Sequence, residues 1–321
     1  MRRNLLAALN PSKNIYTAPI IIILVMFGLG QMLMAGFMSV NNIGNVLTVS
    51  CLVTIAAIAQ TLVLLIGGDG IDLSVGAVMS MSALIGPVFC GGDASKLPLA
   101  IAAVVCIACV IGAINATGVQ FFKIPPLIMT LIMSGVVDGF ALAFTRGQPS
   151  GSIPKIMLNL GRTVWGPVRW LLLVTVVIIV FVELFLRKSR LGRSIYLVGS
   201  NRMAAKLSGI SINKTLFFAY MAGSSMAALG GFLLVGYSGS AMLKMASSYT
   251  MLSVAASVIG GTQLTGGKGT MTGGFLGAII FTILTNILTA LNLPGGVRTL
   301  IQGTVLLIIL AVYTRGEKLR N

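Results

Sequence analysis

The sequence predicts an all-α polytopic integral membrane protein, and two observations support that prediction. Of the 321 residues, 56% are hydrophobic and only 9% are charged, whereas roughly a quarter of the residues of an ordinary soluble domain are charged. Apolar runs of about 20 residues, long enough to cross a bilayer as a helix, recur along the whole chain. We therefore expect a single transmembrane domain over residues 1–321.

About ten apolar runs are predicted to be transmembrane helices, within a range of eight to eleven. They are residues 18–38, 46–66, 73–90, 97–119, 127–145, 170–186, 215–237, 248–264, 270–291 and 299–314. An even number of spans places both termini on one side of the membrane. Most Lys and Arg residues lie on the segments that share that side, and this bias marks the cytoplasmic face. Both termini are thus expected in the cytoplasm.

The N-terminal segment and the net charge fit the same topology. The basic sequence MRRNLLAALNPSK precedes a run of full span length, with no small-residue cleavage site, so we expect an uncleaved first span. The net charge of +16 is spread over the ends of the predicted spans. It therefore indicates membrane orientation, and we expect no nucleic-acid partner.

The loop between the fifth and sixth predicted spans, residues 146–169, is predicted to lie outside. It contains Pro149, Pro154 and Pro167, and residues 153–160 are predicted to form a short surface helix. Its four basic residues run against the rule that basic residues lie mainly on the cytoplasmic side. The loop fits either a lid or partner-docking edge, or a plain exposed connection.

The longest basic stretch, residues 187–214, is here called the island. It carries seven Lys or Arg residues and no acid, between two apolar runs. Residues 198–210 are predicted to form a short helix, with Asn201 or Ser200 capping its first turn and Gly209 ending it in the left-handed conformation. The island is either a docking surface or a solvated, positive-inside connector; sequence spacing leaves both open.

Two glycine-rich turns, residues 67–70 and 266–269, are predicted to lie between spans on the cytoplasmic side. Glycine interruptions in corresponding positions often mark a transport pathway. Elsewhere, small residues inside the spans predict close helix packing.

Few polar side chains lie within the predicted spans, so each is a candidate for the translocation pathway. The candidates are Gln60, Asp72, Asn115, Asp138 and Asn286. Asp138 is the most unusual, because an unpaired carboxylate inside a membrane is costly and should face a partner or a wet pathway. Asp69 and Asp72 flank a predicted helix start, which favours carboxylates.

The sequence does not indicate an enzyme. Histidine is absent, and the chain has neither a Gly-x-x-x-x-Gly-Lys-Ser/Thr phosphate loop nor a nucleophile–base pair. Its four cysteines fall in or beside apolar runs and are expected to be packing residues. We expect no metal or cofactor in this chain.

Four stretches together resemble the permease subunits of ribose-type ABC importers for monosaccharides, in the branched-chain amino acid and ribose permease superfamily. They are residues 70–76 (GIDLSVG), 123–131 (KIPPLIMTL), 192–210 within the island, and 259–269 (IGGTQLTGGKG). Their order and spacing cover most of the chain between residues 45 and 310.

The resemblance implies a multi-pass protein of the bacterial inner membrane that translocates a ribose-like pentose or a hexose. It implies a second permease chain, identical or different, a cytoplasmic ATP-binding subunit that holds ATP and Mg²⁺, and an extracytoplasmic sugar-binding protein. The island, 187–214, would be the coupling loop. The residues expected to contact the ATPase are Gly199, Ser200, Asn201, Ala204, Ala205, Ser208 and Gly209.

Two departures from the family pattern concern acidic residues. Asp69 replaces a glycine, and Asp138-Gly139 stands where members often have Arg-Gly. Asp138 is expected either to pair with a basic residue on a partner chain or to alter the pathway. Two alternatives remain: a self-sufficient secondary transporter that couples ions through Asp138, and a membrane scaffold whose basic loop recruits a cytosolic protein.

Overall fold

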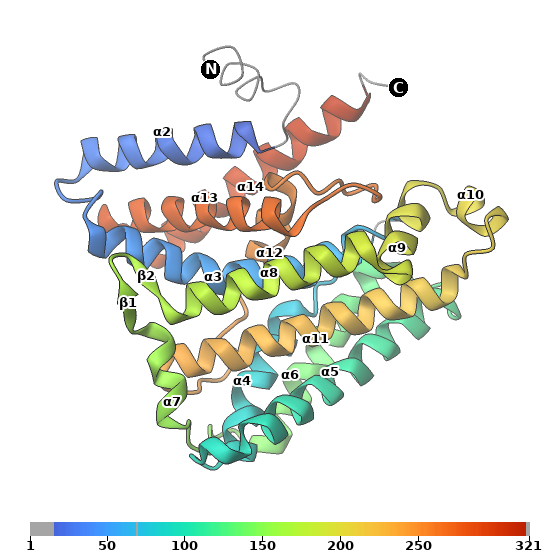
Figure 1. The fold of residues 1–321 in the computed structure, drawn as a ribbon, viewed down its shortest axis with the longest axis horizontal. Coiled ribbons are helices and arrows are strands. Elements are labelled where there is room, and N and C mark those ends of the chain that lie inside the picture. Colours follow the sequence, from blue (N-terminus) through green and yellow to red (C-terminus); the bar gives the residue numbers. More distant parts are fainter. Residues whose placement is uncertain (1–15, 69, 319–321) are drawn as a thin grey trace.

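The computed structural model describes residues 16–68 and 70–318, with side chains as far as residue 308. In this part of the chain the protein is mostly helical, and its long helices lie side by side (Figure 1). The expectations for the N-terminal residues 1–15 and for Asp69 lie outside the described residues.

Over residues 16–68 and 70–318, ten helices match the ten apolar runs predicted from the sequence. They are α2 (Thr17–Leu33), α3 (Val40–Leu64), α4 (Val75–Cys90), α5 (Leu97–Gln120), α6 (Pro126–Thr145), α8 (Trp170–Lys188), α11 (Ile212–Ser238), α12 (Tyr249–Ile259), α13 (Met271–Ala290) and α14 (Gly295–Lys318). The shorter elements are η1 (Ala94–Lys96), α7 (Lys155–Leu158), η2 (Asn159–Gly161), β1 (Thr163–Trp165), β2 (Val168–Arg169), α9 (Arg190–Ser200) and α10 (Arg202–Leu207).

Each predicted run contains a helix, but not every helix has the length of a membrane span. Within the described residues, six are long and apolar enough to cross a membrane: α3, α6, α8, α11, α13 and α5 together with η1. The predicted run 248–264 is a helix only to Ile259, because Gly260 and Gly261 follow and Gly261 has φ +90°. The 11 residues of α12 extend about 16 Å, too short to cross a bilayer. Ten spans therefore remain a prediction.

Helix α11 lies at the centre of the bundle, against α3, α4 and α5. Small residues make this packing possible, as the sequence predicts. A Cβ atom on Gly231 would lie 1.9 Å from the carbonyl oxygen of Met79, and one on Gly112 would lie 2.5 Å from that of Tyr220. The helix backbones thus touch at these positions, which no larger residue permits.

The shorter elements gather at opposite ends of the bundle. Helices α9 and α10 project at one end, whereas α7 and the antiparallel pair β1–β2 lie at the other (Figure 1). The short helix predicted within 153–160 is confirmed as α7 followed by η2. Met157 of α7 is buried against Gly236 of α11, so this part of the loop is packed onto the bundle.

Candidate functional site: the island and the glycine turns

The island folds as two helices rather than the single one predicted. The chain breaks at Asn201, which is extended (φ −161°), and the Asn201 side chain accepts a hydrogen bond from the Ala204 amide at 2.9 Å. Gly209 then ends α10 at φ +77°, where the Ile210 amide donates to the Ala205 carbonyl at 3.0 Å. The predicted cap and stop are both confirmed, but they bound α10 alone.

The predicted ATPase-contact residues divide into two groups. Ser200, Asn201, Ala204, Ser208 and Gly209 are exposed. Ala205 is buried in the chain's own core and Gly199 is half-buried against other backbone. These two residues therefore position α9 and α10 within the chain and offer little or no surface for a partner.

Two exposed apolar residues of α10 were missed by the sequence analysis. Met203 is 67% exposed and Leu207 is 82% exposed. They are four residues apart and therefore share one face of the helix. The sequence carried no clear signal for them, because the island also contains Leu191, Ile195 and Leu197 and only the structure shows which apolar side chains are most exposed.

Three segments far apart in the sequence meet at the base of the island. Gly67, Gly199, Gly266 and Gly267, here called the glycine junction, bring their backbones into contact. The Gly267 amide donates to the Leu65 carbonyl at 2.9 Å. A Cβ atom on Gly199 would lie 1.8 Å from the Leu65 oxygen. The two glycine-rich turns and the island therefore lie at the same end of the molecule, as the sequence predicts.

Arg202, the first residue of α10, also reaches this junction. Its guanidinium donates to the Gly67 carbonyl at 3.3 Å. Since α10 begins at Arg202 and α9 ends at Ser200, both island helices contact the turn between α3 and α4. Helix α10 thus contacts the first glycine-rich turn directly, through Arg202, and α9 contacts both turns, through Gly199 and Ser200.

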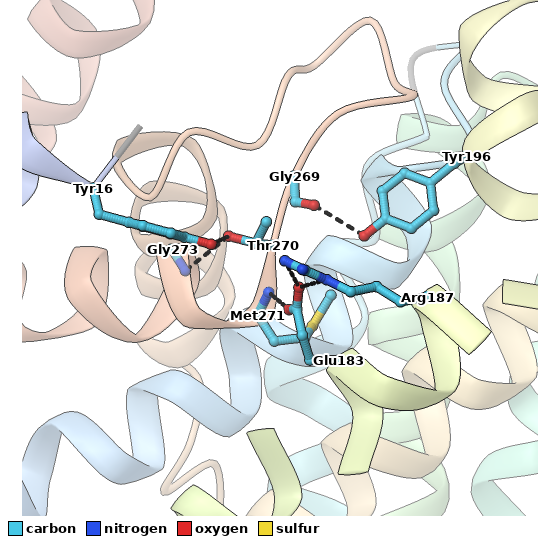
Figure 2. Close-up of polar contacts among 8 residues, drawn as sticks. All are labelled: Tyr16, Glu183, Arg187, Tyr196, Gly269, Thr270, Met271 and Gly273. Carbon is cyan, nitrogen blue, oxygen red and sulfur yellow. Dashed lines mark hydrogen bonds and ion pairs between the residues drawn. The ribbon is translucent and has the colours of Figure 1, made fainter. Parts of the chain in front are cut away.

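A second connection joins α8 to the start of α13, as Figure 2 shows. Glu183 Oε1 pairs with the Arg187 guanidinium at 2.7 Å, while Glu183 Oε2 accepts the Met271 amide at 2.7 Å. We call these three residues the Glu183 clamp. Glu183 and Arg187 are four residues apart on α8, whereas the Met271 amide is 88 residues from Glu183 and left no local signal in the sequence.

Tyr196 of α9 adds a hydrogen bond beside this clamp. Its hydroxyl donates to the Gly269 carbonyl at 2.9 Å (Figure 2). Burial raises the pKa of Tyr196 to about 12, so the phenol keeps its proton at physiological pH. Thr270 caps α13 by accepting the Gly273 amide at 3.0 Å, and the Tyr16 hydroxyl donates to Thr270 Oγ1 at 3.3 Å. The segment before α13 is therefore held by α8 and α9.

Three of the pathway candidates form one buried network at the start of α4. Asp72 Oδ1 accepts the amide and hydroxyl of Ser74 at 2.8 and 2.5 Å, and Asn115 Nδ2 donates to the same hydroxyl at 3.2 Å. The Gln60 amide can pair with both backbone groups of Asp72, at 2.8 and 3.1 Å. Gln60, Asp72 and Asn115 are 0–1% exposed. In this conformation they hold the chain between α3 and α4 rather than line an open passage.

The other two candidates lie elsewhere. Asn286 of α13 donates to Asn42 of α3 at 2.8 Å and so joins two helices. Asp138 of α6 forms an ion pair with Lys244 at 3.3 Å. A basic partner of Asp138 thus lies within this chain. The two expectations for Asp138, a basic residue on a partner chain or an altered pathway, stay predictions.

Comparison with known proteins identifies the family. A family model described as branched-chain amino acid transport system / permease component matches residues 42–310. The chain belongs to this family. The match covers the α3–α4 turn, the island and the loop before α13, and so includes the whole glycine junction.

Similar curated proteins are bacterial permeases. The chain is 36% identical over 280 residues to a probable ABC transporter permease protein, y4mJ, of Sinorhizobium fredii, covering 86% of this chain and 81% of that one. It is 32% identical over 307 residues to the ribose import permease protein RbsC of Escherichia coli, covering 93% of each. The fructose import permease protein FruG of Bifidobacterium longum is 28% identical, covering 92% of this chain and 89% of that one. No solved structure matches the chain.

Proposed function

We propose that this chain is the membrane-spanning subunit of an ABC importer that translocates a monosaccharide, a ribose-like pentose or a hexose. A cytoplasmic ATP-binding subunit would dock on α10 and hold the ATP and Mg²⁺. A second permease chain would complete the membrane domain, and an extracytoplasmic binding protein would deliver the sugar. The similarity to permeases for ribose and fructose supports the substrate class.

One observation carries the docking proposal. Helix α10 projects from the bundle and presents Met203 and Leu207, two large exposed apolar side chains, next to the exposed cations Arg202 and Lys206. An apolar helix face in a groove of a partner is a common mode of recognition, and the surrounding charges then set the orientation.

The proposed mechanism follows the contacts that leave the island. Movement of a bound ATPase would displace α10, and the glycine junction would pass this displacement to the turns that precede α4 and α13. The Glu183 clamp and the Tyr196 hydrogen bond would make α8, α9 and the segment before α13 move together. Because these are backbone contacts and short hydrogen bonds, little motion would be lost between the island and the spans.

The proposal includes the topology predicted from the sequence: ten spans, both termini in the cytoplasm, and a bacterial inner membrane. The short helices α4 and α12 would then not cross the bilayer alone. Each would share its passage with the irregular segment beside it, which proteins tolerate where the segment is covered by neighbouring helices or lines water.

The docking proposal is tested by purification of the tagged chain from gently solubilised native membranes, followed by identification of the co-purifying proteins. We expect an ATP-binding subunit to co-purify with the parent chain and to be lost with Leu207→Glu. A charge in a desolvated apolar contact costs several kcal/mol, which is enough to abolish recovery.

Trp165→Glu provides the matched control, because Trp165 is 81% exposed and belongs to β1, which lies at the opposite end of the bundle from α10. This variant should retain the ATP-binding subunit. Recovery of the parent chain with no ATP-binding subunit would contradict the proposal and favour the ion-coupled secondary transporter. Equal recovery with Leu207→Glu would remove α10 as the docking element.

A further inference from the structure

The Asp138–Lys244 ion pair lies well inside the membrane-spanning part of the molecule. Asp138 is the thirteenth of the 20 residues of α6, which places it about 10 Å from the C-terminal end of the helix. The Lys244 ammonium is 3.3 Å from its carboxylate. A charged side chain at the centre of a bilayer costs roughly 3 kcal/mol even on insertion scales, so this pair requires a polar environment or a cover.

Lys244 belongs to the segment 239–248, which joins α11 to α12 and is not helical. Two hydrogen bonds fix its depth against α4. The Ala246 amide donates to Ser80 Oγ at 3.0 Å, and Thr250 Oγ1 accepts the Gly76 amide at 3.2 Å. Ser80 lies about 15 Å from the Cys90 end of α4. The non-helical backbone of this segment, and not only the end of the Lys244 side chain, therefore lies well below the end of the bundle.

The polar side chains of this region are open to the outside of the chain. The Lys244 side chain is 68% exposed, the Asp138 side chain is 29% exposed, and Ser247 and Ser248 are both exposed. Irregular backbone at membrane depth occurs only where it is buried in protein or lines a water-filled space. By this rule the segment faces water or protein at Lys244, Ser247 and Ser248, and nothing in the described part of the chain covers these residues. Met242 and Leu243, 61% and 40% exposed, form the apolar part of the same segment.

We propose that Asp138, Lys244, Ser247 and Ser248 form a polar wall of the solute passage and contact a neutral, polyhydroxylated solute. The inference rests on the proposed function and names the site that such a solute would meet. The pair carries no net charge, so it does not favour an anionic or a cationic solute over a neutral one. The carboxylate accepts hydrogen bonds from hydroxyl groups, while the ammonium and the serine hydroxyls donate to them.

The aqueous nature of this wall is tested by labelling single cysteines with a membrane-impermeant methanethiosulfonate in permeabilised cells. The background has the four native cysteines replaced by alanine. Ser247→Cys is the main variant, because it leaves the ion pair intact, and Lys244→Cys is the second. Val177→Cys is the matched control, since Val177 is 67% exposed in the middle of the apolar helix α8.

We expect Ser247→Cys and Lys244→Cys to be labelled at least about tenfold faster than Val177→Cys, because the reagent reacts only where water reaches the thiol. If Ser247→Cys reacts no faster than Val177→Cys, the face is covered by lipid or protein and the inference is overturned.

Contact with solute is tested by uptake of radiolabelled ribose and fructose per inserted copy of the chain. The double variant Asp138→Asn/Lys244→Gln removes both charges without leaving one unpaired. We expect its maximal uptake rate to fall about tenfold, because charge-assisted hydrogen bonds to the solute are lost. Uptake equal to the parent would overturn solute contact.

The two proposals fail in different ways. A parent chain that imports ribose or fructose while Ser247→Cys stays unlabelled overturns this inference and supports the proposed function. A parent chain that imports neither sugar overturns the proposed substrate class, while labelling of Ser247→Cys would still support an aqueous wall.

Discussion

At the scale of single residues, Glu183 makes two contacts of very different value. Its ion pair with Arg187 involves a guanidinium that is 60% exposed, and exposed pairs contribute about 0–1 kcal/mol. Its bond to the Met271 amide fixes the first turn of α13 from another helix. The charged carboxylate is also favoured at the N-terminus of a helix. We attribute most of the effect of Glu183 to the second contact.

Glu183→Ala should therefore lower the free energy of unfolding by about 2 kcal/mol, since it leaves the Met271 amide without its acceptor. Glu183→Gln keeps an oxygen acceptor and should lose about half as much, while Arg187→Met should lose less than about 1 kcal/mol. The measurement is chemical unfolding of the purified chain in detergent. A larger loss for Arg187→Met than for Glu183→Ala would show that the ion pair, and not the amide bond, is the main contact.

At the scale of elements, the glycine junction explains why the island and two distant turns can touch. At this junction the backbones approach so closely that a Cβ atom would overlap a neighbouring backbone. Gly199 is the tightest case, because its Cβ would lie 1.8 Å from the Leu65 oxygen and 2.6 Å from the Gly267 amide nitrogen. Both neighbours are backbone atoms, so neither can rotate away as a side chain would. A substitution here must separate α9 from the turns.

Gly199→Ala should destabilise the chain by about 1–3 kcal/mol, the usual range for added volume in a packed site. Under the proposed mechanism it should also reduce sugar uptake per ATP hydrolysed. Gly135→Ala is the control, because a Cβ at Gly135 meets no atom within 4 Å and α6 is helical there. Thermal unfolding and paired uptake and ATPase assays provide the readouts. Equal behaviour of the two variants would show that the junction is not a tight contact.

At the scale of the whole molecule, the sequence predicted what depends on local pattern. Apolar runs located the long helices, and the caps at Asn201 and Gly209 located the ends of α10. The sequence analysis missed features that depend on chain pairing in space. Neither the Met271 amide that donates to Glu183 nor the Lys244 partner of Asp138 has a periodicity or a spacing that marks it. The run 248–264 was overextended because hydropathy does not register the backbone break at Gly260 and Gly261.

The orientation of the molecule in the membrane is supported only by the distribution of Lys and Arg over its loops. The island carries seven basic residues, but the loop 146–169 at the opposite end carries four, so the charge difference between the two ends is modest. Basic residues in short loops next to span ends have the largest influence on orientation. The island follows α8 directly, and its basic residues therefore favour the cytoplasmic side.

We expect Leu207→Cys to lie in the cytoplasm and Trp165→Cys to lie outside. Both side chains are more than four-fifths exposed, and α10 and β1, to which they belong, lie at opposite ends of the bundle. The chain is expressed without the proposed ATP-binding subunit, so that α10 stays uncovered and access of reagent differs only by side. In the cysteine-free background, an impermeant maleimide added to cells with a permeable outer layer should label Trp165→Cys at once. Leu207→Cys should react only after the inner membrane is opened. The reverse order would invert the topology and would place α10 where no cytoplasmic ATPase can reach it.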